Sequence, residues 1–196
     1  MSWHLKLLGE AKFYHVLDRL DEDLAGMARC EPCRHCGGVL HRAHYPRKPR
    51  GGPRNLPKSY EKRASLCCAV DGCRHRATPP SVRFLARRVY LGGVVVLASA
   101  MQDGLSGFRT KRLKELVGVS RQTLERWRIW WQEAFPSSRF WQSLRGRFMP
   151  AVDEGQLPAS MLERLDAGEQ GIWSVLAMLR LMQPISTAPW LEASAS

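Results

Sequence analysis

Residues 111–131 read Lys-Arg-Leu-Lys-Glu-Leu-Val-Gly-Val-Ser-Arg-Gln-Thr-Leu-Glu-Arg-Trp-Arg-Ile-Trp-Trp. Apolar residues recur at helical spacing in two short blocks, so each block has one apolar face and one charged face. Gly118 lies between the blocks, where a sharp turn needs a permissive backbone, and Ser120 is a good N-cap for the helix that follows. The stretch therefore predicts two helices joined by a tight turn.

Two helices joined in this way have the layout of a helix-turn-helix, whose second helix lies in the DNA major groove and reads base edges near its N-terminus. Arginine can pair with guanine, and glutamine with adenine, through two hydrogen bonds each. The residues predicted to meet DNA on the second helix are Arg121, Gln122, Thr123 and Arg126. The residues better placed to hold phosphates are Lys111, Arg112 and Arg128. An ordinary helical hairpin in a core is the alternative.

Six cysteines occur in two groups, Cys30-Glu-Pro-Cys33-Arg-His-Cys36-Gly-Gly and Cys67-Cys68-Ala-Val-Asp-Gly-Cys73. Tetrahedral zinc takes four soft ligands, and two turns that each offer a pair of thiolates supply them at small entropic cost. The predicted Zn²⁺ ligands are Cys33, Cys36, Cys68 and Cys73. Because cysteine can fill all four positions, we expect a structural site and no catalytic one.

The sequence also offers alternative metal ligands. Cys30 could replace Cys33 or Cys36, and Cys67 could replace Cys68. The histidines that could stand in for a cysteine are His35, His41, His44 and His75. Six reduced cysteines without a metal is the remaining interpretation.

The segment 41–58 between the two cysteine groups is rich in proline and glycine, which predicts a long extended loop. Such a loop is uncommon inside a compact unit unless it has a task. Its basic residues predicted to meet phosphates are Arg47, Lys48, Arg50 and Arg54. A solvated flexible insertion is the alternative.

The formal net charge is +12 and is unevenly distributed over the 196 residues. Residues 29–106 hold 15 Lys or Arg against 4 Asp or Glu, and residues 107–147 hold 10 against 3. This concentration around the cysteines and the paired helices favours a polyanionic partner, with nucleic acid the first candidate. A hydrophobic fraction of 44% suits a globular protein. No signal peptide or membrane-spanning stretch is visible, so we expect a cytoplasmic protein, in which cysteines are more often metal ligands than disulfides.

The expected fold is mainly α with a small β zinc ribbon, in which a helix-turn-helix core follows an N-terminal helix and the zinc-binding module. The expected regions are an N-terminal helix (1–28), a zinc ribbon with a basic loop (29–78), a helix-turn-helix domain (79–135), a C-terminal helical region (136–183) and a disordered tail (184–196). A helix from about Phe84 to Met101 would open the helix-turn-helix core, with Gly92 and Gly93 indicating a close neighbour or a kink.

The residues Gly118, Val119, Ser120, Thr123, Leu124, Arg126 and Trp127 resemble the turn and second helix of bacterial regulators, resolvases and transposases. The cysteine groups are similar to the zinc ribbons of transposases and transcription proteins, but four residues separate the second pair where two are common. Together they resemble transposon-encoded proteins that combine both modules. The resemblance implies an accessory or truncated transposase that binds double-stranded DNA, alongside a transposase or integrase or as a homodimer, without a membrane role.

Two other function classes remain open from the sequence. An active recombinase or nuclease would need spaced carboxylates, and the candidates are Asp103, Asp153 and Glu154. No set like the three magnesium-binding carboxylates of recombinases is recognisable, so we expect no enzyme activity. An RNA-binding or protein-interaction module is the other class, although a short recognition helix suits the DNA major groove better than the deep, narrow groove of RNA.

Overall fold

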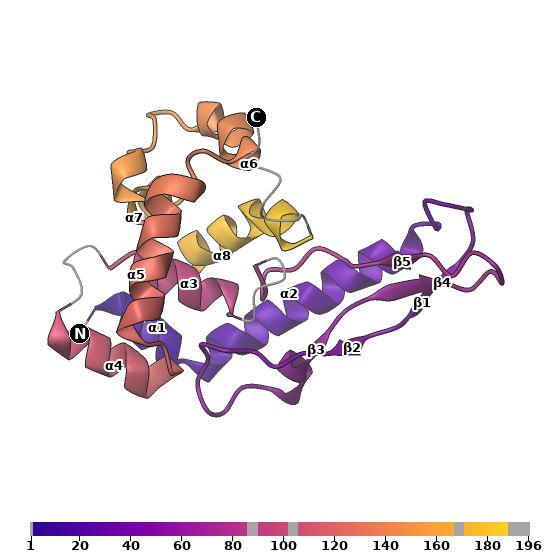
Figure 1. The fold of residues 1–196 in the computed structure, drawn as a ribbon, viewed down its shortest axis with the longest axis horizontal. Coiled ribbons are helices and arrows are strands. Elements are labelled where there is room, and N and C mark those ends of the chain that lie inside the picture. Colours follow the sequence, from indigo (N-terminus) through magenta and orange to yellow (C-terminus); the bar gives the residue numbers. More distant parts are fainter. Residues whose placement is uncertain (1, 86–89, 102–105, 167–170, 188–196) are drawn as a thin grey trace.

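The chain begins with two consecutive helices, and the second connects a group of helices to an extension that contains the strands. The computed structural model describes residues 2–85, 90–101, 106–166 and 171–187. Helix α1 spans Trp3–Gly9 and helix α2 spans Ala11–Cys30. In Figure 1, α2 leads from a group of helices to an extension in which the strands run beside it. The chain is mainly helical with a small antiparallel β part, which confirms the coarse prediction of the fold class.

The structure divides the single helix predicted for residues 1–28 into α1 and α2. Glu10 separates them in an extended conformation (φ −84°, ψ 114°), directly after Gly9, a poor helix former. The apolar stripe of α2 is buried as expected, with Phe13 0% and Leu17 1% exposed. The Tyr14 hydroxyl donates a hydrogen bond to the Leu8 carbonyl, which fixes the angle between the two helices.

Within the described residues, the β part has five short strands, which lie between α2 and the helical group along the chain. Their bounds are β1 (Leu40–Arg42), β2 (Tyr45–Pro46), β3 (Lys62–Arg63), β4 (Leu66–Cys68) and β5 (Arg76–Ala77). A three-stranded antiparallel sheet has the order β1-β4-β5, and β2 pairs with β3 as a separate hairpin. The segment 41–58, predicted to be all loop, therefore contributes strand residues at its start and a 3₁₀ turn, η1 (Lys58–Glu61), at its end.

The helical group contains the main core. Its helices are α3 (Gly92–Ser99), α4 (Gly107–Val117), α5 (Arg121–Ile129), α6 (Arg139–Leu144), α7 (Ala159–Arg164) and α8 (Ile172–Leu181). A π-helical turn, η2 (Trp130–Ala134), extends α5, and 3₁₀ turns occur at η3 (Arg145–Arg147), η4 (Glu154–Gln156) and η5 (Gln183–Ser186). Trp127, Trp131 and Trp141 are each at most 2% exposed and are the largest fully buried side chains of this core.

Helix α3 begins later than the sequence predicts. It starts at Gly92 and not near Phe84, whose backbone pairs with Leu91 in an isolated antiparallel bridge; residues 86–89 of the predicted helix lie outside the described residues. Gly92 and Gly93 therefore form the first turn, where glycine costs less than in a helix interior. Gly93 has the close neighbour that the glycines indicate, the Phe13 ring: a Cβ on Gly93 would lie 2.7 Å from Cζ of Phe13.

Gly93→Ala is expected to destabilise the protein by about 1–3 kcal/mol, because the added methyl group would overlap the fully buried Phe13 ring. Gly26→Ala is the matched control, since Gly26 lies within α2 and no atom would lie within 4 Å of its Cβ. We expect that change to stabilise the protein by up to about 1 kcal/mol. Urea unfolding of both variants measures the difference, and equal stabilities would contradict the packing of α2 on α3.

A buried ionic network joins α2 to the segment before α3. Asp21, 2% exposed, accepts hydrogen bonds from the Ser81 hydroxyl, from the Val82 backbone N–H (2.7 Å) and from Nε of Arg83 (2.8 Å). Asp18 accepts a second bond from Arg83 through Nη1. The guanidinium carbon also lies 4.9 Å from the centre of the Tyr60 ring. The network holds the helical group and the extension together.

The C-terminal prediction is partly wrong. Two residues of the predicted disordered tail pack on the core: Ile185 and Ser186 are buried, and the Ser186 hydroxyl accepts a hydrogen bond from the Ser81 backbone N–H. Residues 188–196 of the predicted tail lie outside the described residues. Across the described parts of the chain, no helix is both long and apolar enough to cross a bilayer.

Candidate metal centre and nucleic-acid interface

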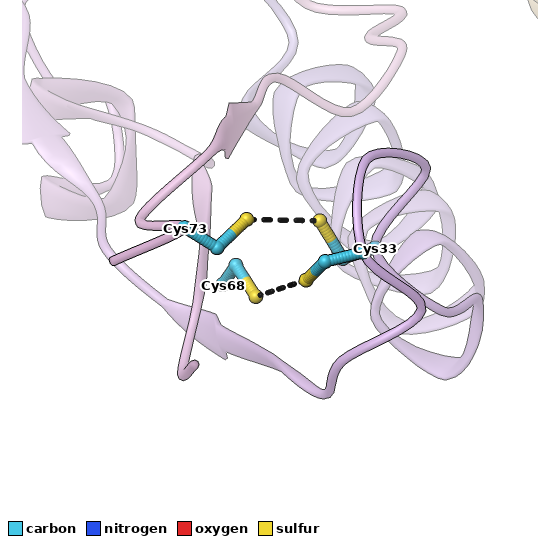
Figure 2. Close-up of side chains that lie close together, drawn as sticks. Cys33, Cys68 and Cys73 are labelled. Carbon is cyan, nitrogen blue, oxygen red and sulfur yellow. Dashed lines mark hydrogen bonds between the residues drawn. The ribbon is translucent and has the colours of Figure 1, made fainter. Parts of the chain in front are cut away.

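Four cysteines meet at the end of the extension. Cys33 and Cys36 lie in the turn that follows α2, Cys68 ends β4, and Cys73 precedes β5. Their sulfur atoms all lie within 4.8 Å of one another, with 3.9 Å between Cys33 and Cys73 and 3.4 Å between Cys36 and Cys68. Figure 2 shows the sulfur atoms of Cys33, Cys68 and Cys73 pointing into one small space. The structure brings together the four cysteines predicted as ligands.

Both cysteine turns depend on glycine. The Cys33 N–H donates to the Gly38 carbonyl and the Gly37 N–H donates to the Cys33 carbonyl, which folds the first turn back on itself with Gly37 at φ 72°. A Cβ on Gly38 would lie 2.4 Å from Cγ2 of Val70 and 3.1 Å from the Cys68 sulfur, so a side chain there would displace its neighbours. Gly72, at φ 84°, makes the equivalent bend in the second turn. The backbone thus preforms the cluster.

The thiols of the cluster are electrostatically unequal. Backbone N–H groups of His35 and Cys36 lower the pKa of Cys33 to about 7. At Cys68 the backbone N–H of Val70 acts in the same direction, but burial and the neighbouring sulfur atoms outweigh it and raise the pKa to about 12. A divalent cation would replace these protons, because thiolates and not thiols are metal ligands.

The dimensions of the cluster fit a tetrahedral metal. Four sulfurs bound to zinc at about 2.3 Å lie about 3.8 Å from one another, and the sulfur distances of 3.4 Å (Cys36 to Cys68) and 3.9 Å (Cys33 to Cys73) fall on either side of that value. Among the described residues, no other group of three or more Cys, His, Asp or Glu side chains has its potential ligand atoms close enough together to hold a metal ion. The arrangement is compatible with a structural metal site that leaves no coordination position open.

The alternative ligands lie outside the cluster. Cys30 is the last residue of α2 and is exposed, while the half-buried Cys67 turns away from Cys68 within β4, with its sulfur 3.7 Å from the Arg74 carbonyl. None of the four candidate histidines joins the cluster. His35 and His75 instead stack on each other, with ring centres 5.8 Å apart. The ligand set that the geometry favours is therefore all-cysteine.

Helices α4 and α5 form the predicted pair with a tight turn. Gly118 adopts a left-handed conformation (φ 67°, ψ 21°) and its N–H donates to the Lys114 carbonyl, which ends α4. The Ser120 hydroxyl accepts a hydrogen bond from the Thr123 N–H and caps α5. Val119, between them, is fully buried against the core. The three residues of the turn thus perform the local roles that their types predict.

The predicted DNA-facing residues of this pair are exposed, with one exception. Exposed on α4 and α5 are Lys111, Arg112, Arg121, Gln122, Arg126 and Arg128. Thr123 is 3% exposed, and its hydroxyl lies within hydrogen-bond distance of Ser120 and accepts from Arg126. The structure corrects the assignment of Thr123, which supports the start of α5 from inside and does not face a partner.

The basic loop packs against the turn between α4 and α5. The Leu91 N–H donates to the Arg50 carbonyl, and Gly51, at φ 72°, is buried so that a Cβ there would lie 3.1 Å from the Tyr90 ring and 3.5 Å from Val119. The Tyr90 hydroxyl in turn lies 3.4 Å from the Thr123 hydroxyl. The loop and the start of α5 are therefore neighbours, a connection that Gly51 and Tyr90 make and that sequence analysis missed.

The four predicted cations of the loop are not equivalent. Lys48, Arg50 and Arg54 are exposed. Arg47 is half-buried, and its guanidinium carbon lies 5.0 Å from the centre of the Phe84 ring, so its head group points inward. Arg47 is therefore a poorer candidate for a phosphate contact than the other three.

The candidate catalytic carboxylates do not form a site in the described residues. Asp153 accepts a hydrogen bond from the Gly155 N–H and caps η4. Glu154 accepts from the indole N–H of Trp141 and lies 3.5 Å from Arg145. Asp103 lies outside the described residues. The first two carboxylates have structural partners that account for their positions.

The comparisons with family models, with curated proteins and with solved structures found no match, so the geometry described above is the basis for any functional conclusion.

Proposed function

We propose that the chain is a zinc-stabilised protein that binds double-stranded DNA, with α4 and α5 as a helix-turn-helix and the cysteine module as a zinc ribbon. The observation that carries the proposal is the first half of α5. There the exposed Arg121, Gln122 and Arg126 stand opposite a buried face of Leu124 and Trp127, after a capped, glycine-dependent turn. A recognition helix presents its side chains to base edges in this way.

Zinc is the proposed metal because of the donor set. Tetrahedral sites with four thiolates in proteins hold zinc or iron, and zinc adds no redox chemistry to a site that has a structural position between β4, β5 and the end of α2. Cys33, Cys36, Cys68 and Cys73 would hold the ion and fix the extension to α2. The metal would supply folding energy and take no part in a reaction.

Two side chains are the main candidates for sequence reading. In the free protein Arg121 pairs with Glu125 at 2.9 Å, but both side chains are about half exposed or more, and such surface pairs contribute about 0–1 kcal/mol. Arg121 can therefore exchange that partner for the acceptor atoms of guanine. Gln122, next to it, offers the donor and acceptor that adenine requires.

Backbone contacts would come from the surfaces beside α5. Lys111 and Arg112 extend from α4, and the exposed cations Lys48, Arg50 and Arg54 belong to the loop that Gly51 fixes against the turn. Phosphate contacts provide affinity that falls steeply with salt, and contacts to bases provide discrimination. The loop and α4 would thus hold the duplex while α5 reads it.

Fluorescence anisotropy with labelled duplex DNA, single-stranded DNA and duplex RNA at two salt concentrations tests the proposal. We expect duplex DNA to bind more tightly than duplex RNA, with an affinity that falls as salt rises. Arg121→Ala is expected to weaken duplex binding by roughly tenfold or more, in line with about 1–3 kcal/mol for a bidentate base contact. Arg164→Ala, at an exposed arginine of α7, is the control and should have little effect.

Equal binding of duplex DNA and duplex RNA, or equal losses in the Arg121 and Arg164 variants, would contradict the assignment of α5. The prediction of a mobile-element role, with a transposase or integrase as partner or with a second copy of the chain, stays a prediction. The same holds for the recombinase alternative, which a magnesium-dependent cleavage assay of the Asp103, Asp153 and Glu154 variants would test.

A further inference from the structure

A basic cleft lies between the paired strands β2 and β3 and the segment of chain that connects them. No residue of α5 lines it. Its volume is about 760 Å³, within the range of small-molecule and nucleotide sites. The residues of its lining that bear on its chemistry are Tyr45, Lys48, Arg54, Tyr60, Glu61 and Lys62. The lining thus combines aromatic rings with an excess of positive charge.

The basic side chains that line the cleft outnumber its acidic one, Glu61. Lys48, Arg54 and Lys62 are exposed, and no ion pair joins any of them to an acidic residue in the described part of the chain. Burial, followed by the charges of Arg42, Lys62 and Arg83, lowers the pKa of His44, which also lines the cleft. An anion is therefore the ligand that the charge of the cleft favours.

Proline residues and close packing restrict the backbone that forms the cleft. Four prolines line it, at positions 46, 49, 53 and 57, and proline restricts the backbone of both walls. Gly52 packs so closely that a Cβ there would lie 2.4 Å from the Leu56 side chain and 3.0 Å from that of Leu91. The floor is also rigid, since the Tyr60 hydroxyl donates to the Tyr14 carbonyl of α2. A preformed site of this kind loses little entropy on binding.

We propose that this cleft binds an unpaired DNA strand, with Lys48, Arg54 and Lys62 on its phosphates and a base stacked on Tyr45. Sites for single strands combine a positive groove with an aromatic side chain in the same way. A lone phosphate would leave the aromatic wall without a partner, and a paired base offers no free face to a side chain inside a cleft. The proposal rests on the proposed function for the kind of polymer. The cleft shares Lys48 and Arg54 with the surface proposed to contact duplex phosphates, and Tyr45 and Lys62 distinguish it from that surface.

The test compares a short oligothymidylate with an abasic phosphodiester chain of the same length, both read by anisotropy on the full, metal-loaded protein. We expect the oligothymidylate to bind at least about fivefold more tightly, because stacking of a base contributes about 1 kcal/mol or more. Tyr45→Ala should abolish this preference and Tyr45→Phe should retain it. Lys62→Gln should weaken both ligands, while Arg164→Gln, with the same loss of charge on α7, should weaken neither.

Several outcomes would overturn the proposal. Equal affinity for the oligothymidylate and the abasic chain would show that the cleft binds phosphates and no base. Full competition by inorganic phosphate would show the same. If Lys62→Gln weakened duplex DNA as much as oligothymidylate, the cleft would belong to the duplex surface. Tighter binding of oligouridylate than of oligothymidylate would assign it to RNA. A different result concerns α5 alone: if the wild-type protein bound oligothymidylate but not duplex DNA, the proposed function of α5 would be contradicted and the proposal for the cleft would be supported.

Discussion

Replacing Cys68 with serine is expected to release the metal and to unfold the sheet at the end of the extension, while the helical group stays folded. The separate core of this module consists of Cys33, Leu40, Leu66 and Cys68, so two of its four buried side chains are proposed ligands. Burial of two leucines contributes about 3–6 kcal/mol. A structural zinc site contributes about 10–16 kcal/mol of apparent binding free energy. The metal therefore supplies most of the stability of this part.

Two measurements check the prediction together. Elemental analysis should find zinc in the wild type and little in Cys68→Ser, and limited proteolysis should cut the variant within residues 31–77. Cys67→Ser is the matched control, because Cys67 is the neighbouring residue and its sulfur lies outside the cluster. Retention of zinc by Cys68→Ser, or iron in place of zinc in the wild type, would contradict the proposed centre.

Asp21→Ala is expected to destabilise the whole chain by about 3–5 kcal/mol, the usual cost of removing one partner from a buried ion pair. The change would leave Arg83, 5% exposed, with Asp18 as its remaining carboxylate. It would also leave the buried Ser81 hydroxyl and the Val82 N–H without their acceptor. Because the network joins α2 to the segment before α3, both parts of the molecule should lose stability together.

Asp23→Ala is the control for this prediction. Asp23 is exposed on the same helix, and alanine is the better helix former, so this variant should be as stable as the wild type or slightly more stable. Urea unfolding of the metal-loaded proteins gives the comparison. If the free energies of unfolding of the two variants differed by less than about 1 kcal/mol, the buried network would contribute no more to stability than a surface ion pair does.

Local signals in the sequence predicted the parts of the site that lie close together along the chain. Gly118 and Ser120 have roles that depend on backbone conformation and on one neighbouring helix turn, and the structure shows both roles. The cysteine spacings likewise placed each pair of sulfurs in one turn. That the two pairs meet depends on the register of β1 and β4, in which Leu40 pairs with Cys68, and spacing alone could not specify that register.

The contacts between distant segments could not be read from the sequence. In the sequence, Asp21 is one of several charges in a helical pattern and Arg83 follows a pair of prolines, so both look like ordinary surface charges. In the structure they form a buried ion pair. The start of α3 differs from the predicted one because an apolar run such as the one that precedes it is shared by helices and buried strands. Thr123 is predicted to meet DNA, whereas its hydroxyl lies inside, near the hydroxyls of Ser120 and Tyr90. Each error concerns a neighbour that only the tertiary structure supplies.

Selection of bound sequences from a pool of random duplexes tests the central claim most directly, because it measures base discrimination apart from charge. The wild-type protein should enrich a defined motif, and Arg121→Ala should relax that motif at one position while the rest is retained. Enrichment of no motif by the wild type, or of an unchanged motif by Arg121→Ala, would contradict the assignment of α5 as the helix that reads DNA.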